Sequence, residues 1–195
     1  MTGTPLVRDQ LDLVPDAILA GRAADGDTAA FEALARRYGP HMRACARRLT
    51  GQYADADDVV QEALVQAWKQ LESLRDPAAV KGWLLRLTGS RSIDYLRRRR
   101  NHTSLSALEE GGAGREPAAA APGPESSAVA ASGTEALKAA LLRLPEEQRR
   151  CWVLKEFNGQ SYEQIAQTLN ISPASVRGRL ARARITLVRE MEGWR

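Results

Sequence analysis

The fold is decided by SYEQIAQTLNISPASVRGRLARAR, residues 161–184, which has the pattern of two short helices joined by a tight turn. Ser161 and Gln164 have the spacing of a capping box at the start of the first helix. Asn170 favours a turn, and Ser172 followed by proline favours the start of a second helix. We therefore predict a helix-turn-helix, a unit that places its second helix in the major groove of DNA.

The predicted second helix has an apolar face and a basic face. The apolar residues follow helical spacing and are expected to pack inward: Val176, Leu180, Ala183 and Leu187. The residues on or beside the opposite face, which we expect to contact DNA, are Ser175, Arg177, Gly178, Arg179, Arg182 and Arg184. Arginine suits this role, because its planar guanidinium donates paired hydrogen bonds to a guanine edge or a phosphate. The alternative is a basic face that contacts only solvent.

The composition indicates a globular protein of one or two small domains. The 195 residues are 44% hydrophobic and 27% charged, with a net charge of +4. No run of about 18 apolar residues could span a bilayer, and the first residues lack the pattern of a secretion signal, so we expect a cytoplasmic location. Cys45 and Cys151 belong to no C-x-x-C or Cys/His cluster, and we expect two buried free thiols.

A stretch of low complexity divides the chain. Residues 101–133 are rich in Ala, Gly, Pro, Ser and Glu and have no periodic apolar pattern, which predicts a flexible, disordered linker. The two flanking parts are net basic and the linker region is net acidic, so the expected partner of the two ends is a polyanion. Two interpretations of the acidic linker remain open: its charges have a role of their own, or the linker only separates the two domains. After the linker, Leu137 is expected on a buried stripe.

Both parts show helical periodicity without a strand pattern, so the predicted fold class is all-α, with two small helical domains. Asp27 is placed to cap a helix that ends at Gly51. A second helix is expected from Asp55 or Asp57, with Trp68 in its buried stripe.

Several stretches resemble the conserved blocks of bacterial sigma factors, in particular the extracytoplasmic-function (ECF) group of the sigma-70 family. They are DADDVVQEALVQAW from Asp55, KGWLLRLTGSRSIDYLRRRR from Lys81, and LPEEQRRCWVLKEF from Leu144 together with the helix-turn-helix. The resemblance implies a protein that binds core RNA polymerase, directs it to a promoter and helps to open the duplex.

By this resemblance, residues 16–100 form the region 2 domain, preceded by an N-terminal extension over residues 1–15. Region 2 binds the clamp helices of the largest polymerase subunit, here through Asp58, Gln61, Glu62 and Val65. These residues offer carboxylates around an apolar centre, which suits a basic, partly apolar partner helix. The alternative is a solvated helix face.

Region 2 also recognises unpaired bases of the −10 element. The corresponding residues are Leu74, Arg75, Asp76, Ser90, Arg91, Asp94, Arg97 and Arg98. Ser90, preceded by Gly89, stands where the family usually has asparagine, and a hydroxyl offers fewer hydrogen bonds to a base than a carboxamide does.

Residues 134–195 correspond to the region 4 domain, which recognises the −35 element in the major groove. Gly178 stands where the family commonly has serine, so one hydrogen bond to DNA is missing. Most relatives also have a dedicated anti-sigma factor, which is an expected partner here.

The sequence gives less support to two other function classes. An enzyme is not supported, because the sequence contains no nucleophile arrangement, metal cluster or phosphate loop, and we expect no catalytic residue, metal or cofactor. A dimeric helix-turn-helix regulator that acts without polymerase is the alternative, and a palindromic binding site would favour it.

Overall fold

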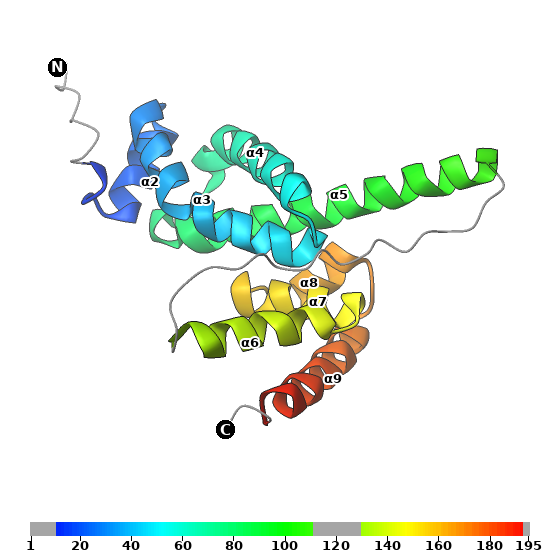
Figure 1. The fold of residues 1–195 in the computed structure, drawn as a ribbon. Helices are drawn as coiled ribbons and strands as arrows, with labels where there is room; N and C mark the ends of the chain where they lie inside the picture. Colours follow the sequence, from blue (N-terminus) through cyan, green and yellow to red (C-terminus); the bar gives the residue numbers. More distant parts are fainter. Residues whose placement is uncertain (1–10, 111–129, 193–195) are drawn as a thin grey trace, which may run out of the picture.

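The structure is a computed structural model that describes residues 11–110 and 130–192, which contain helices and no strand (Figure 1). Residues 111–129, the larger part of the predicted linker, lie outside the described residues, as do residues 1–10 of the predicted extension. The helices of the first domain are α2 (Asp16–Ala24), α3 (Thr28–Thr50), α4 (Tyr53–Gln70), the short turns η1 (Leu71–Ser73) and η2 (Pro77–Ala79), and α5 (Val80–Glu110). Those of the second are α6 (Ala130–Arg143), α7 (Glu146–Trp152), η3 (Val153–Phe157), α8 (Tyr162–Leu169) and α9 (Pro173–Glu192).

The first domain is a bundle in which α3 packs against α2, α4 and α5. Helix α3 begins and ends as the sequence predicts: the Asp27 carboxylate accepts a hydrogen bond from the Ala30 amide, and Gly51 ends the helix at a φ of 78°. The apolar stripe of α3 is buried, with Leu34, Met42 and Leu49 almost fully excluded from solvent. This stripe forms the centre of the bundle core.

Residues 11–15, which the sequence assigns to the N-terminal extension, contact the bundle of the first domain. Leu11 is buried, and the Arg37 guanidinium donates to the backbone carbonyls of Asp12 (2.8 Å) and Val14 (3.0 Å). Arg37 also forms an ion pair with Asp16. Residues 11–15 are therefore part of the bundle, and sequence periodicity missed them because the contacts that hold them come from about 25 residues away.

Helix α4 differs from the prediction at its start and in its stripe. It begins at Tyr53, and Asp55 is buried in its first turn, where it pairs with Arg99 at 2.7 Å. Trp68 was expected in the core, but it is 38% exposed, and its ring meets the Phe31 ring in a T-shaped arrangement at a centroid distance of 5.1 Å. The indole lies at the rim of the bundle, where part of so large a ring reaches solvent.

Helix α5 is longer than the sequence indicates. The Asp76 carboxylate accepts from the Ala78 amide at 3.0 Å and so caps the turn η2, from which α5 continues to Glu110. The helix thus extends ten residues beyond the domain boundary predicted at residue 100, and Figure 1 shows this end projecting beyond the bundle.

The second domain contains the predicted helix-turn-helix, formed by α8 and α9. The capping box of Ser161 and Gln164 is present, and Asn170 ends α8 in the left-handed conformation at a φ of 53°. The Ser172 hydroxyl accepts from the Ser175 amide at the start of α9. The predicted apolar stripe of α9 is buried against α6, α7 and α8. Leu141 of α6 and Leu144, which follows the helix, are buried, but Leu137, which the sequence places on the same stripe, is 36% exposed.

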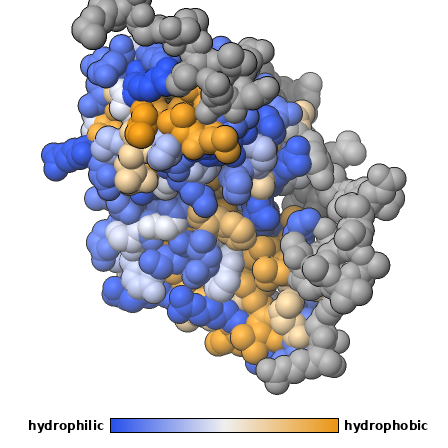
Figure 2. Space-filling model, turned by 90° about the vertical axis from the view of Figure 1, so that its left-hand side faces the viewer, coloured by the Kyte–Doolittle hydropathy of each residue, from blue (hydrophilic) through white to orange (hydrophobic). Residues whose placement is uncertain are grey.

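The two domains lie against each other, with α7, η3 and α8 packed on α3 and α5 (Figure 1). One cluster of buried apolar residues continues from the first domain into the second, and a smaller second cluster lies between α6 and α9. Both cysteines are free and buried, as predicted. Over residues 11–110 and 130–192, every helix is too short or too polar to cross a membrane. Figure 2 shows apolar surface in the upper and the lower half of one face, separated by hydrophilic side chains.

Candidate protein and nucleic-acid interfaces

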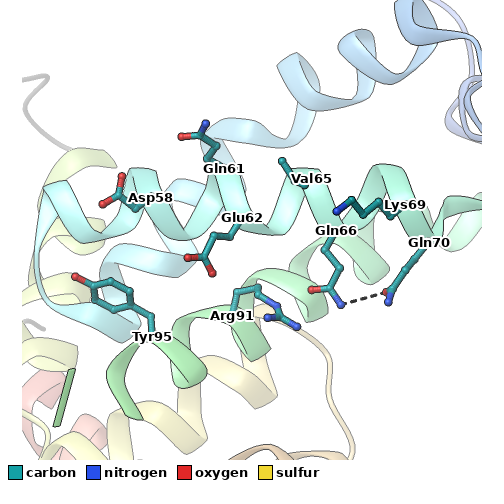
Figure 3. A pocket seen from close by; sticks show the side chains of 9 residues that line it. All are labelled: Asp58, Gln61, Glu62, Val65, Gln66, Lys69, Gln70, Arg91 and Tyr95. Carbon is teal, nitrogen blue, oxygen red and sulfur yellow. Dashed lines mark hydrogen bonds between the residues drawn. The ribbon is translucent and has the colours of Figure 1, made fainter. Parts of the chain in front are cut away.

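An open groove of about 660 Å³ lies between α4 and α5. Figure 3 shows its walls, with Asp58, Gln61, Glu62, Val65, Gln66, Lys69 and Gln70 from α4 and with Arg91 and Tyr95 from α5. All four residues predicted to contact polymerase therefore line one surface. Val65 is 51% exposed, so the groove presents an apolar side chain among polar ones. The arrangement suits a partner helix that carries both basic and apolar residues.

The ion pairs of this groove can exchange partners. Glu62 accepts two hydrogen bonds from Arg98, at 2.9 and 3.1 Å, and both side chains are more than 40% exposed. An exposed ion pair contributes about 0–1 kcal/mol. A charged partner can therefore replace either residue at little cost in free energy.

Tyr95, which lines the groove, belongs to a second polar cluster around Asp55. Asp55, which pairs with Arg99, also accepts from the Tyr95 hydroxyl, and burial together with this hydrogen bond raises the pKa of Tyr95. The Tyr95 hydroxyl is therefore the donor to the Asp55 carboxylate. Sequence analysis missed Tyr95 because its partners lie on another helix.

The residues predicted to recognise the −10 element occupy two places. Arg75 and Asp76 are exposed in the loop between η1 and η2, and Leu74 beside them is half-buried against the core. The others lie in the middle of α5: Ser90, Arg91, Asp94, Arg97 and Arg98. Asp94 lies 3.8 Å from Arg91 and 3.4 Å from Arg97, so this carboxylate orients two arginines along α5.

The outer face of α9 presents most of the residues predicted to contact the −35 element. Ser175, Arg177, Arg182 and Arg184 are exposed, and Gly178 is half-buried. A methyl group added at Gly178 would meet only the Arg182 guanidinium, at 3.6 Å. Space inside the protein therefore does not require a glycine at this position.

Arg179 departs from this pattern. Its guanidinium pairs with Glu147 of α7 at 2.8 Å, and its side chain is only 21% exposed. It also lies close to the buried Cys151 thiol, whose pKa burial raises and Arg179 lowers. Arg179 therefore packs against α7, which the helical periodicity of α9 alone did not indicate.

The described residues contain no group of three or more His, Cys, Asp or Glu side chains that could hold a metal ion. The chemistry that the two surfaces offer is recognition: charged and hydrogen-bonding groups on α4, α5 and α9. The groove on α4 and the exposed face of α9 belong to different domains, so two partners can be bound by one chain.

Known protein families match a stretch of the chain in each domain. Residues 34–102 match the family model of sigma-70 region 2, and residues 134–187 match that of sigma-70 region 4. The chain is 34% identical to the ECF RNA polymerase sigma factor SigM of Mycobacterium tuberculosis, over 89% of this chain and 83% of that protein. It is 32% identical to the ECF RNA polymerase sigma-E factor of Escherichia coli, over 87% of this chain and 90% of that protein.

Two solved structures share the fold. CnrH, in complex with the cytosolic domain of CnrY, is 28% identical with a TM-score of 0.52, over 91% of this chain and 97% of that one. The sigma factor RpoE of Bartonella quintana, in complex with the anti-sigma factor NepR, is 25% identical with a TM-score of 0.57, over 83% and 96%. With both conserved regions present in order, the chain belongs to the ECF group of the sigma-70 family and is an RNA polymerase sigma factor.

Proposed function

We propose that the groove between α4 and α5 docks on the clamp helices of core RNA polymerase, while α5 and α9 contact the two promoter elements. The observation that carries this proposal is the clustering of Asp58, Gln61, Glu62 and Val65 on one open surface. The first domain, predicted from the sequence as residues 16–100, would then bind polymerase and the −10 element. Residues 134–195 would bind the −35 element.

Recognition of the −10 element requires bases that have left the duplex. An unstacked base offers a free edge and an aromatic face, which a protein surface can test by hydrogen bonding and packing. The loop at Leu74–Asp76 and Ser90 on α5 are the proposed contacts to such bases. The arginines that follow on α5 are suited to the phosphates beside them, because phosphate contacts fix the register of a protein on DNA.

The first half of α9 is the proposed contact to the −35 element. Ser175, Arg177 and Arg182 are exposed there, as a helix that enters the major groove requires. Arg184 lies 3.7 Å from Glu156 and is placed to contact a phosphate at the groove edge. The chain would act through binding alone, as a non-enzymatic initiation factor.

The proposed setting is the bacterial cytoplasm, where polymerase and promoters are found. An anti-sigma factor is a proposed partner, since the two structurally similar sigma factors were solved with CnrY and NepR bound.

The docking surface is tested by reversing one charge. Asp58→Arg places a cation on a surface that is proposed to meet a basic helix, and like charges across an interface cost several kcal/mol. We expect the variant to lose copurification with core polymerase while its circular dichroism spectrum is unchanged. Glu72→Arg is the matched control, because Glu72 is exposed on η1 outside the groove. Equal core binding by wild type and Asp58→Arg would reject this surface.

A further inference from the structure

A segment at the start of the first domain lies beside the loop Leu74–Asp76, a proposed contact to the −10 element. The segment comprises residues 11–15 and α2, and the match to sigma-70 region 2 begins after it, at residue 34. Helix α2 packs against both η1 and η2, the two turns that flank the loop. Figure 1 shows α2 at the end of the bundle opposite the projecting end of α5. We call residues 11–24 the brace, because the turns on both sides of the loop rest on them.

Buried apolar contacts join the brace to these turns. Leu11 and Leu19 of the brace are almost fully buried, and they belong to one cluster with Leu71 of η1 and Val80, the first residue of α5. Leu74, at the start of the loop, is partly buried against the same cluster. Because a close-packed interior transmits displacements, the position of the loop depends on the position of the brace.

Arg37 of α3 holds the start of the brace. Its Nη2 atom donates to three backbone carbonyls, those of Asp12 (2.8 Å), Val14 (3.0 Å) and Leu11 (3.4 Å). Its Nη1 atom pairs with Asp16, the first residue of α2, and the Arg37 side chain is only 26% exposed. Helix α2 has no side-chain cap of its own at this end. Hydrogen bonds from a charged donor are stronger than those between neutral groups, so Arg37 fixes an end that local sequence does not.

Both ends of α2 are tied to α3. At the start of α2, the second carboxylate oxygen of Asp16 accepts a hydrogen bond from the Tyr38 hydroxyl. Near its other end, the Arg22 Nε atom donates at 2.8 Å to Asp27, which caps α3. These contacts leave α2 little freedom to shift along or away from the bundle.

We propose that the brace positions the loop Leu74–Asp76 for the bases of the −10 element, and that Arg37 is the positioning residue that fixes the brace. This inference rests on the proposed function of the loop. A loop that already has its bound conformation loses less entropy on binding, which increases its affinity for the correct base. Arg37 acts through α2 and the two turns, and not by contact with DNA.

Arg37→Ala tests the brace in the free protein. The Leu74 amide donates to the Leu71 carbonyl and the Ala79 amide donates to the Asp76 carbonyl, each at 3.0 Å, so exchange of these two amide hydrogens reports opening of the turns. We expect their exchange rates to rise about 5- to 150-fold, the usual range for coupling between two parts of a protein. The amides of α4 should keep their rates, because the brace and α4 are separate parts of the bundle.

Arg36→Ala is the matched control, since it removes the same charge from the neighbouring residue. Arg36 is 42% exposed, and its ion pairs with Asp12 (3.4 Å) and Glu32 (3.9 Å) contribute little to stability. We expect no change in exchange at the turns. Asp16→Asn is a milder second variant, which keeps the side-chain volume but removes the charge that faces Arg37. It should change the exchange rates in the same direction as Arg37→Ala, by a smaller factor.

The role of the brace on a promoter is measured with core polymerase. Promoters are first selected from a randomised library with the wild-type protein, and run-off transcription then compares each selected −10 element with its single-base substitutions. We expect Arg37→Ala to lower this discrimination about fivefold or more, and to leave discrimination at the −35 element and copurification with core unchanged. A variant that is only less stable would lower the transcript from every promoter by the same factor.

The outcomes separate the brace from the proposed function. Faster exchange at Leu74 and Ala79 together with reduced −10 discrimination supports the brace. Unchanged exchange in both Arg37→Ala and Asp16→Asn overturns it, whatever the protein does on a promoter. Faster exchange with full −10 discrimination overturns the positioning role of Arg37. If the wild type shows no preference at the −10 element, the proposed function of the loop fails and so does the promoter role of the brace, while the exchange rates still show whether the brace fixes the loop.

Discussion

Arg182 and Arg179 occupy the same face of α9 in a helical projection, but their surroundings differ. Arg182 is exposed, whereas Arg179 pairs with Glu147 across the domain. We predict that Arg182→Ala weakens binding of the chain to the −35 element. If the Arg182 guanidinium contacts a base edge, the loss of binding free energy is about 1–3 kcal/mol. Fluorescence anisotropy with a labelled −35 duplex and the full chain measures this change.

Arg143→Ala is the control for loss of one positive charge in the same domain. Arg143 lies on α6 and pairs with Glu190 at 2.6 Å, away from the start of α9. An equal loss of affinity in both variants would mean that Arg182 contributes only general electrostatic attraction. Unchanged affinity in Arg182→Ala would remove it from the DNA-binding surface.

Single residues were predictable where local sequence decides their environment. Ser161, Asn170 and Asp27 act as caps or turn residues, and each depends on neighbours a few positions away. Arg179 and Gly89 were not predictable in this way. Their environments are set by Glu147 and Asn158, which lie 32 and 69 residues away in the chain.

At the scale of elements, the turn between α8 and α9 depends on a left-handed residue. Asn170 has a φ of 53°, which costs an ordinary side chain about 1–2 kcal/mol and glycine little. We predict that Asn170→Ala lowers the free energy of unfolding of the second domain by about 1 kcal/mol, while Asn170→Gly maintains it. Chemical denaturation followed by circular dichroism measures both. Equal stability of the alanine and glycine variants would show that the turn does not depend on this conformation.

Helix periodicity predicted the order and type of the elements but not their limits. The cap and end of α3 and the buried stripe of α9 match the prediction. Trp68 and Leu137 lie on predicted stripes yet reach solvent, because periodicity gives the direction of a side chain and not how far the neighbouring helices cover it. The extension of α5 to Glu110 was missed since the composition there lacks an apolar stripe.

At the scale of the whole molecule, the two helical domains were predictable and their packing against each other was not. The sequence predicted two domains and the separate surfaces on α4 and α9, because each depends on a pattern within one helix. Their mutual packing was not predictable, since it arises from contacts between α3, α5 and η3 that no local pattern encodes.

The central claim is that one chain binds core polymerase and two promoter elements at once. Run-off transcription with purified core polymerase, this protein and a library of randomised promoters tests it most directly. We predict transcripts that depend on the protein and come from promoters sharing two short elements at one fixed spacing. No protein-dependent transcript, together with binding to an inverted repeat as a symmetric dimer, would contradict the claim.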